Sequence, residues 1–242
     1  LPGYVSSNML SFFKRHKIRT CDIFGRGSEL PLSLGLATIE KDLIYIKLRK
    51  KIIDGINLNF FKKIISGVPL IINKNKYKID ISSSYDDRLY NDKWMKKLSK
   101  TKCVLGVEGG SSIFDFDSSV QYLNEKLKVD KSNSVKSSNI YLDHFSKYNN
   151  IHHRTITPRI FEAICSGTIL LLLEGEYRNA LKPYVHYIPI KKDLSNIWNV
   201  LKLTLNKNYT SRMRKKSFDE VAMNKKYHFK YFTNKIDMII SS

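Results

Sequence analysis

The chain has 242 residues, of which 42% are hydrophobic and 26% are charged. This composition excludes an intrinsically disordered chain and provides for one sizeable hydrophobic core or two small ones. No apolar run approaches the roughly 18 residues that cross a bilayer as a helix. The net charge of +20 favours polyanionic partners, either a nucleic acid or an anionic membrane surface. Because 32 of the 42 basic residues are Lys and Arg is preferred for phosphates and base edges, specific nucleic-acid binding is disfavoured.

The first half of the chain alternates short apolar runs with segments of helical periodicity. These patterns predict strands over 20–24, 68–72, 78–81 and 102–107, and helices over 42–65 and 92–98. In the second helix, Trp94, Met95 and Leu98 fall on one side, as in a helix that packs against a core. We expect residues 1–21 to be a linker or a remnant of an upstream domain.

The second half begins with a segment over 126–150 that is rich in Ser, Asn and Lys, which predicts a flexible insertion with a short helix over 141–148. Pro158 and Gly167 bracket a predicted helix over 159–166. The remaining predicted elements are a strand over 168–173 and helices over 194–205 and 211–222. Apolar strands that alternate with helices are typical of a parallel sheet with helices on both faces. We therefore predict an α/β, Rossmann-like domain over 22–242.

Three cysteines, Cys21, Cys103 and Cys165, lie far apart in apolar surroundings. An odd and sparse set argues against a disulfide framework, and no Cys/His spacing indicates structural zinc. We expect three buried thiols in a reducing, cytoplasmic environment.

Three turns lie where a parallel sheet binds its ligands, beyond the carboxyl ends of the strands. They are 25–27, which contains Arg26, then 108–112 and 174–177. In the second turn, Gly109, Gly110, Ser111 and Ser112 are suited to donating backbone N–H groups to a phosphate. The alternative is that the glycines only make tight turns.

The predicted helix after Thr157 carries a more specific pattern. Arg159 and Glu162 are three residues apart and therefore share a helix face. Arg159 lies in the first turn, where the helix dipole favours anions, and the Glu162 carboxylate can accept the two hydroxyls of a ribose. The alternative is an intrahelical Arg159–Glu162 ion pair that binds no ligand.

Residues 159–168 read R-I-F-E-A-x-x-x-G-T and precede an apolar strand and a Gly-containing loop. This segment resembles the donor-binding half of GT-B glycosyltransferases. Residues 106–117 resemble the G-x-E-S/G-G-x-S-I-x-D-F-D stretch of a bacterial surface-polysaccharide group of these enzymes. Other segments are similar to that group in the same order: 22–35, 174–177 and 186–196. The resemblance covers about Asp22 to Asp237.

The resemblance implies a transferase that moves a sugar from a nucleotide-sugar to a glycan or lipid-linked acceptor in surface polysaccharide synthesis. It implies that Glu162 binds the ribose and that the diphosphate meets Arg159, Arg26 and the turn Gly109-Gly110-Ser111-Ser112. The loop of Gly175, Glu176 and Tyr177 is expected near the sugar or the phosphates, and Glu108 and Glu174 are candidate catalytic residues. The expected location is the cytoplasm, at the inner face of the cell membrane.

The chain departs from the family pattern in places. Many retaining GT-B enzymes have a further Glu upstream of the ribose-binding one, and Arg154 occupies that position here. Asp115-Phe116-Asp117 has the Asp-x-Asp form of a GT-A metal site, but it lies inside a GT-B-like stretch. We therefore expect no bound metal and no cofactor besides the donor substrate. His152-His153 favours a solvent-facing or acceptor-side role over metal binding.

The match begins at the second domain of a GT-B enzyme, so we expect this chain to bind the donor but to transfer sugar poorly by itself. Two other functions remain open from the residues. One is a basic polyanion- or nucleic-acid-binding module without catalysis, and the other is an interaction domain that kept the fold and lost turnover. The lack of clustered Arg and aromatic residues disfavours the first of these.

Overall fold

The computed structural model describes residues 5–13, 18–26, 78–82, 87–110, 118, 122 and 154–241. The elements predicted over 42–65, 68–72 and 126–150 lie outside these residues. The chain divides into two compact units. The first comprises Leu1–Gly25, Leu89–Glu108 and Thr155–Ser242, and the second comprises Arg26–Arg88 and Gly109–Arg154.

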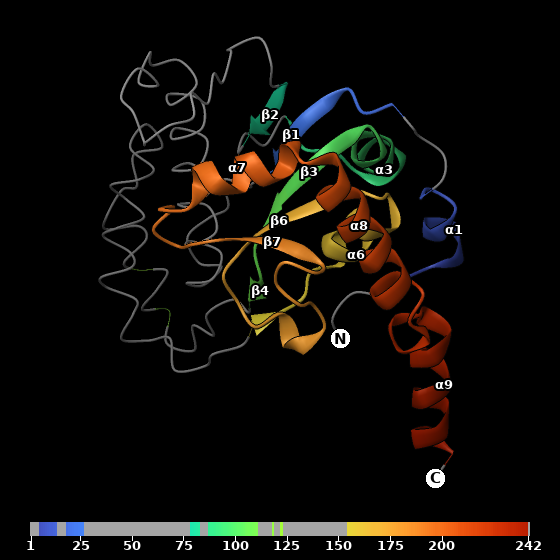
Figure 1. The fold of residues 1–242 in the computed structure, drawn as a ribbon. Coiled ribbons are helices and arrows are strands. Elements are labelled where there is room, and N and C mark those ends of the chain that lie inside the picture. Colours follow the sequence, from blue (N-terminus) through green and yellow to red (C-terminus); the bar gives the residue numbers. More distant parts are fainter. Residues whose placement is uncertain are drawn as a thin grey trace, which may run out of the picture. The chain divides into compact units, whose positions relative to one another are not determined.

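Five strands form one sheet in the order β2-β1-β3-β6-β7 (Figure 1). Their bounds are β1 Cys21–Arg26, β2 Ile79–Ser82, β3 Thr101–Gly106, β6 Ile169–Leu173 and β7 Tyr187–Ile190. The pairs β1–β3, β3–β6 and β6–β7 are parallel, with Leu105 opposite Leu171 and Leu171 opposite Ile188. The strands predicted over 20–24, 78–81, 102–107 and 168–173 are confirmed, and so is the Rossmann-like α/β fold class.

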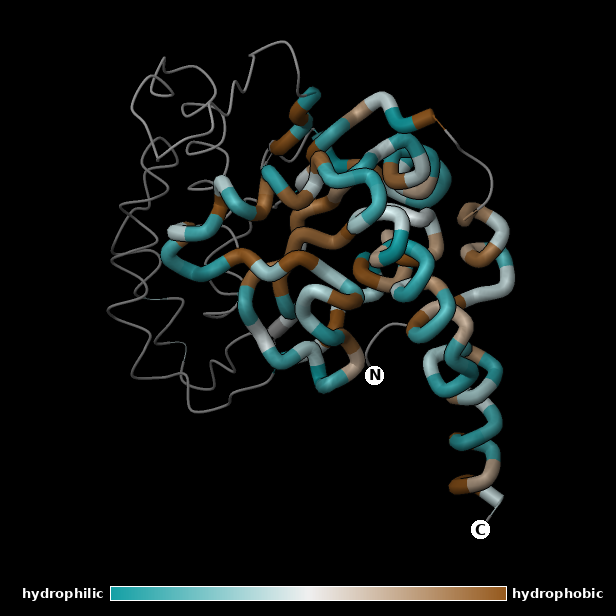
Figure 2. Tube along the Cα trace, in the orientation of Figure 1, coloured by the Kyte–Doolittle hydropathy of each residue, from teal (hydrophilic) through white to brown (hydrophobic). Residues whose placement is uncertain are grey.

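The centre of the sheet is apolar on both faces. All five residues of β6 are buried, as are all four residues of β7. A central parallel strand is covered on both sides, so its residues form a continuous hydrophobic run instead of an alternating one (Figure 2).

The helices that pack around the sheet are α3 Asn91–Ser99, α6 Pro158–Cys165, α7 Ile197–Leu205 and α8 Lys207–Ser217. The predicted buried side of α3 is confirmed, because Trp94 and Leu98 are buried. Gly167 ends α6 with a φ of 65°, a left-handed conformation that glycine adopts without steric cost. The last predicted helix starts earlier than expected, since the Asn206 side chain accepts from Tyr209 N and caps α8 there.

Several elements were not predicted from the sequence. They are α1 Ser7–Leu10, η4 Tyr177–Asn179, η6 Lys225–Tyr227, α9 Phe229–Ile240 and strand β7. Residues 218–222, predicted as the end of the last helix, form a π-helical turn, η5 Phe218–Ala222. The run that forms β7 is short and contains Pro189, which obscures a strand pattern. β7 lies at the end of the strand order, the position where a sheet tolerates proline.

The segment 1–21, predicted to be a linker or an upstream remnant, contributes to the core of the first unit. Val5 is 2% exposed and belongs to the main hydrophobic cluster, with Met9 and Leu10 packed against it. The backbone N–H of Val5 donates to the Tyr227 carbonyl at 2.8 Å, which ties the start of the chain to the segment before α9.

The expectation that the three cysteines are buried thiols is confirmed. Cys21, Cys103 and Cys165 are free thiols and are buried. Burial raises the pKa of both Cys103 and Cys165 to about 12, so these thiols stay protonated and unreactive at neutral pH. Within the described part of the chain, no helix has both the length and the apolar character needed to cross a membrane.

Candidate functional site

The fold of the first unit gathers two helix starts and two loops at one edge of the sheet. Helices α3 and α6 lead through short turns into strands β3 and β6, so each helix begins at the carboxyl edge of the sheet. The residues after β3 and β6 emerge at the same edge, because the two strands are parallel neighbours. This edge is where open α/β sheets bind ligands.

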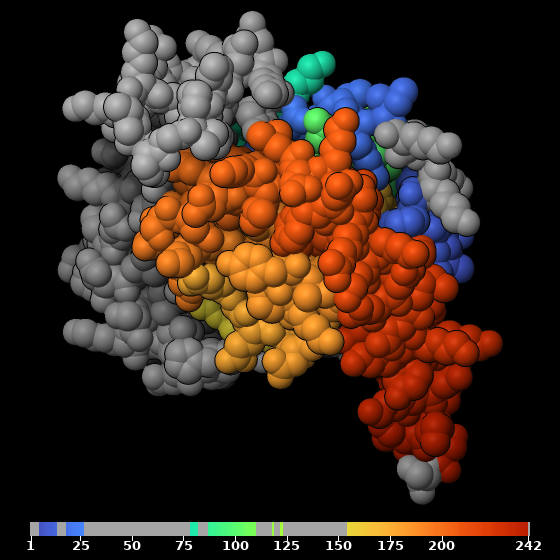
Figure 3. All heavy atoms as spheres, in the orientation of Figure 1, coloured from blue at the N-terminus to red at the C-terminus, as the bar shows by residue number. Residues whose placement is uncertain are grey.

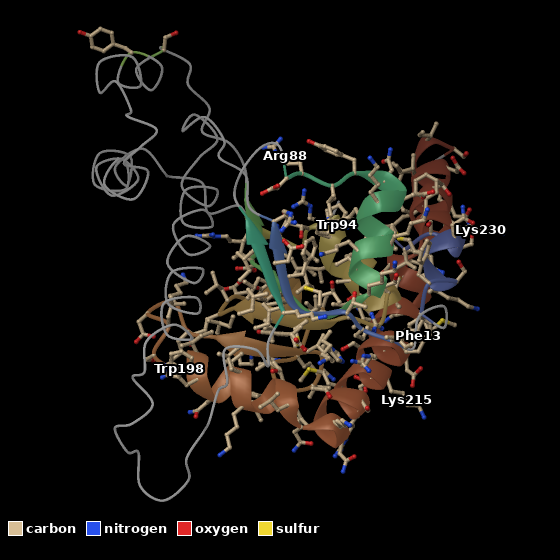
Figure 4. The ribbon with its side chains drawn as sticks, turned by 90° about the horizontal axis from the view of Figure 1, so that it is seen from above. Phe13, Arg88, Trp94, Trp198, Lys215 and Lys230 are labelled. Atoms are coloured by element: carbon tan, nitrogen blue, oxygen red, sulfur yellow. The ribbon has the colours of Figure 1, made fainter. Side chains whose placement is uncertain are left out.

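Glu162 is the fifth of the eight residues of α6 and is half-buried. Its Oε2 accepts a hydrogen bond of 2.7 Å from the indole Nε1 of Trp94, which lies near the start of α3 (Figure 4). Burial raises the pKa of Glu162 above the ordinary value, and the Trp94 hydrogen bond and the Arg159 charge oppose this rise. The carboxylate is thus held in place and desolvated, two conditions that strengthen hydrogen bonds from a ligand hydroxyl.

Arg159 and Glu162 share a helix face, as predicted. The structure adds the Trp94 ring, which contacts both side chains. The Arg159 guanidinium carbon lies 4.9 Å from the centre of the Trp94 ring, a cation–π contact. Trp94 therefore contacts both residues, the cation through its face and the carboxylate through its N–H. Sequence reasoning placed Trp94 on the core side of its helix and missed this positioning role; its only signal was a location near a helix start.

The two tryptophans of the chain, Trp94 and Trp198, allow the Glu162 pKa to be measured. Trp198→Phe leaves Trp94 as the only indole, and we expect its fluorescence to titrate with a midpoint above the ordinary glutamate pKa. Adding Arg159→Gln should raise the midpoint further, because the Arg159 charge lowers this pKa. Adding Glu162→Gln should abolish the transition, and a transition that persists would show that another group is being titrated.

Glu108, the residue predicted as a catalytic candidate after β3, holds the neighbouring loop. Its Oε1 accepts a 2.7 Å hydrogen bond from the backbone N–H of Tyr177. Its side chain also packs on Gly175, where a Cβ would come within 2.7 Å of Glu108 Cδ. Gly175 is needed for this close approach, and Glu108 acts as a positioning residue for the loop that follows β6.

The Tyr177 side chain, predicted to lie near the donor, anchors the loop from inside. It is fully buried, its hydroxyl donates to the Leu173 carbonyl at 2.6 Å, and its ring packs against Tyr187 with centroids 5.2 Å apart. Tyr177, Arg178 and Asn179 have φ values of 44°, 50° and 55°. Three consecutive left-handed residues are costly, so the buried phenol and the Glu108 hydrogen bond maintain a strained turn.

The exposed part of this loop consists of Glu174, Gly175 and Glu176. Burial, followed by the charges of Glu108 and Glu174, raises the pKa of the Tyr187 hydroxyl, so this phenol remains protonated at neutral pH. Glu174 itself is exposed to solvent. It follows the end of β6, on the edge of the sheet where α6 begins.

Other predicted site residues belong to the second unit. The Arg26 side chain forms a 2.6 Å ion pair with Asp80 and donates to the carbonyls of Asp80 and Asp87 at 3.2 and 2.9 Å. Gly109 and Gly110 differ from the predicted strand-to-helix turn. They form a short strand, β4 Gly109–Gly110, which pairs with β5 Arg154–Thr155.

The remaining predicted residues, Ser111, Ser112, Asp115, Asp117 and the pair 152–153, lie outside the described residues. Within the first unit, two contact groups therefore lie at the carboxyl edge of the sheet. One is Trp94 with Arg159 and Glu162, and the other is Glu108 with the loop 174–177.

No family model matches the chain, and no curated protein matches it.

Proposed function

We propose that the chain is the nucleotide-sugar-binding domain of a glycosyltransferase that acts on a glycan or lipid-linked acceptor in surface polysaccharide synthesis. The observation that carries the proposal is the Glu162–Trp94 hydrogen bond of 2.7 Å, which fixes the carboxylate one turn into α6. A desolvated carboxylate that is fixed at the ligand-binding edge of a Rossmann-like sheet is suited to accepting the two hydroxyls of a ribose. The motif over 159–168 supports the same function by its resemblance to GT-B enzymes.

In this proposal the exposed Arg159 faces the diphosphate of the donor. Its planar guanidinium forms bidentate hydrogen bonds with phosphate oxygens, and the positive dipole end of α6 adds to the attraction. As the bond between the anomeric carbon and the diphosphate breaks, negative charge develops on the leaving oxygen. Arg159 stabilises that charge and so favours departure of the nucleotide.

The exposed Glu174 is the stronger candidate for contact with the acceptor, because the Glu108 carboxylate already binds Tyr177 N–H. The acceptor oxygen forms the new bond to the anomeric carbon and gives up its proton, while the bond to the diphosphate oxygen breaks. A carboxylate such as Glu174 takes that proton. We place this reaction in the cytoplasm, at the inner face of the cell membrane.

The test of the function is thermal unfolding of the chain with a panel of nucleotide sugars that differ in base and sugar. The matching donor should raise Tm, by an amount that corresponds to about 2.7 kcal/mol at a hundredfold excess over Kd. At the same donor concentration Glu162→Gln should be protected much less than wild type. Protection by heparin or single-stranded DNA, with none from any nucleotide sugar, would instead identify the basic polyanion-binding module.

Donor binding is expected to be independent of divalent metal. Arg159 and the positive dipole end of α6 meet the diphosphate charge in place of a cation. Among the residues described, no three His, Cys, Asp or Glu side chains are gathered as ligands of one ion. Calorimetric titration in excess chelator should give the same Kd as in magnesium. Binding that is lost in chelator and restored by manganese would assign a metal site to Asp115 and Asp117.

A further inference from the structure

Helix α9 carries an apolar stripe along one side. Phe229, Phe232, Ile236 and Ile240 recur at spacings of three and four residues, and Ile239 borders them, so these five residues share one helix face. We call them the α9 stripe. Ile239 is 66% exposed and Ile240 is 77% exposed.

Helix α9 adds little to the core of its unit. None of its residues is buried, and Figures 1 and 3 show α9 extending away from the other elements of the first unit. An exposed apolar face of this kind on a soluble domain marks an interaction site. Since the helix contributes no buried residue, substitutions on the stripe should leave the fold intact.

The charges around α9 are strongly biased. Lys225, Lys226, Lys230 and Lys235 are exposed, and Asp237 is the single acidic residue between positions 225 and 240. Lys230 and Lys235 lie on α9 outside the stripe, so the apolar face is accompanied by cations (Lys230 is labelled in Figure 4). A second copy of this chain would bring a like charge to the contact, on a protein whose net charge is +20.

We propose that α9 binds an anionic phospholipid surface as an interfacial helix. The α9 stripe enters the boundary between headgroups and acyl chains, and the lysines contact the anionic headgroups. The proposal stands independently of glycosyl transfer, because it uses no residue of the candidate site. It would hold the domain at a membrane, where a lipid-linked acceptor is present.

The experiment is co-sedimentation of the full 242-residue chain with vesicles, without any nucleotide sugar. The vesicles are phosphatidylcholine alone or phosphatidylcholine with about one third phosphatidylglycerol. We expect partitioning at least about tenfold stronger on the anionic vesicles, and weaker as salt rises. The double variant Ile236→Ser/Ile240→Ser should lower it by about tenfold or more.

Two matched controls separate the stripe from general effects. Met238 is 73% exposed on the opposite side of α9, so Met238→Ser should change partitioning by less than about twofold. Lys230→Gln/Lys235→Gln should weaken binding more than Lys202→Gln/Lys207→Gln, which removes the same charge from α7 and α8. All variants should keep the wild-type Tm.

Three results would overturn the proposal. One is equal partitioning on neutral and anionic vesicles, and another is equal loss from Ile236→Ser/Ile240→Ser and Met238→Ser. The third is a dimer, seen by light scattering, that the stripe variant abolishes, since this would assign the stripe to a second copy. Failure here leaves the nucleotide-sugar test unaffected, so the two proposals are judged separately.

Discussion

Replacing Glu162 with glutamine is expected to weaken nucleotide-sugar binding by about 10- to 100-fold. The substitution removes the charge that strengthens each hydrogen bond from a ribose hydroxyl, while the amide oxygen can still accept from Trp94 Nε1. The substitution should not lower the stability of the fold. Burial raises the Glu162 pKa in the folded state, so ionisation of this carboxyl lowers the free energy of unfolding as pH rises through that pKa. A neutral amide therefore keeps or slightly increases Tm at neutral pH.

The measurement is isothermal titration of wild type and variant with the donor that the thermal panel identifies. Asp219→Asn is the matched control, since it removes one negative charge from an exposed position in η5. Its Kd should equal that of wild type. An unchanged Kd for Glu162→Gln would remove Glu162 from the binding site, whichever donor is used.

Replacing Arg19 with alanine is expected to lower the free energy of unfolding by about 3–5 kcal/mol. Arg19 Nη1 donates to the carbonyls of Leu98, Ser99 and Thr101 at 3.2, 2.6 and 3.1 Å, and Nη2 donates to those of Ser166 and Gly167, both at 3.0 Å. These acceptors lie at the ends of α3 and α6, where the helix dipoles favour a cation. One guanidinium thus ties together the two helices that position the candidate site.

The Arg19 effect should be present at neutral pH. Burial, and then the neighbouring Arg214, lower the Arg19 pKa to about 10, which still leaves the group protonated there. Urea unfolding followed by tryptophan fluorescence gives the free energies. Arg212→Ala, at an exposed position of α8, should change stability by no more than about 0.5 kcal/mol. Arg19→Lys should also lose most of the stabilisation, because one ammonium group cannot donate to the five carbonyls that the planar guanidinium reaches. A loss below about 1 kcal/mol for Arg19→Ala would contradict this role.

Much of the fold could be predicted from local patterns. The apolar run of β6 identified a strand buried on both faces, since a parallel strand that is covered on both sides has no polar face. Pro158 and Gly167 gave the bounds of α6, because each restricts or permits a specific backbone conformation at a helix end. The pair Arg159 and Glu162 followed from helical spacing alone.

The tertiary structure decided which groups these residues meet. The Trp94 indole is 68 positions from Glu162, the Glu108 carboxylate is 69 positions from Tyr177 N–H, and Arg19 is 148 positions from Gly167. No local period records such pairings, because they form only when parallel strands align the ends of distant helices and loops. The sequence by itself therefore determined the central strands β3 and β6 and the helices that precede them, but not β7 or α9. Tertiary packing decided that Trp94 orients Glu162, that Glu108 holds a loop and that Arg19 joins two helices, since desolvation and long-range hydrogen bonds exist only in the folded chain.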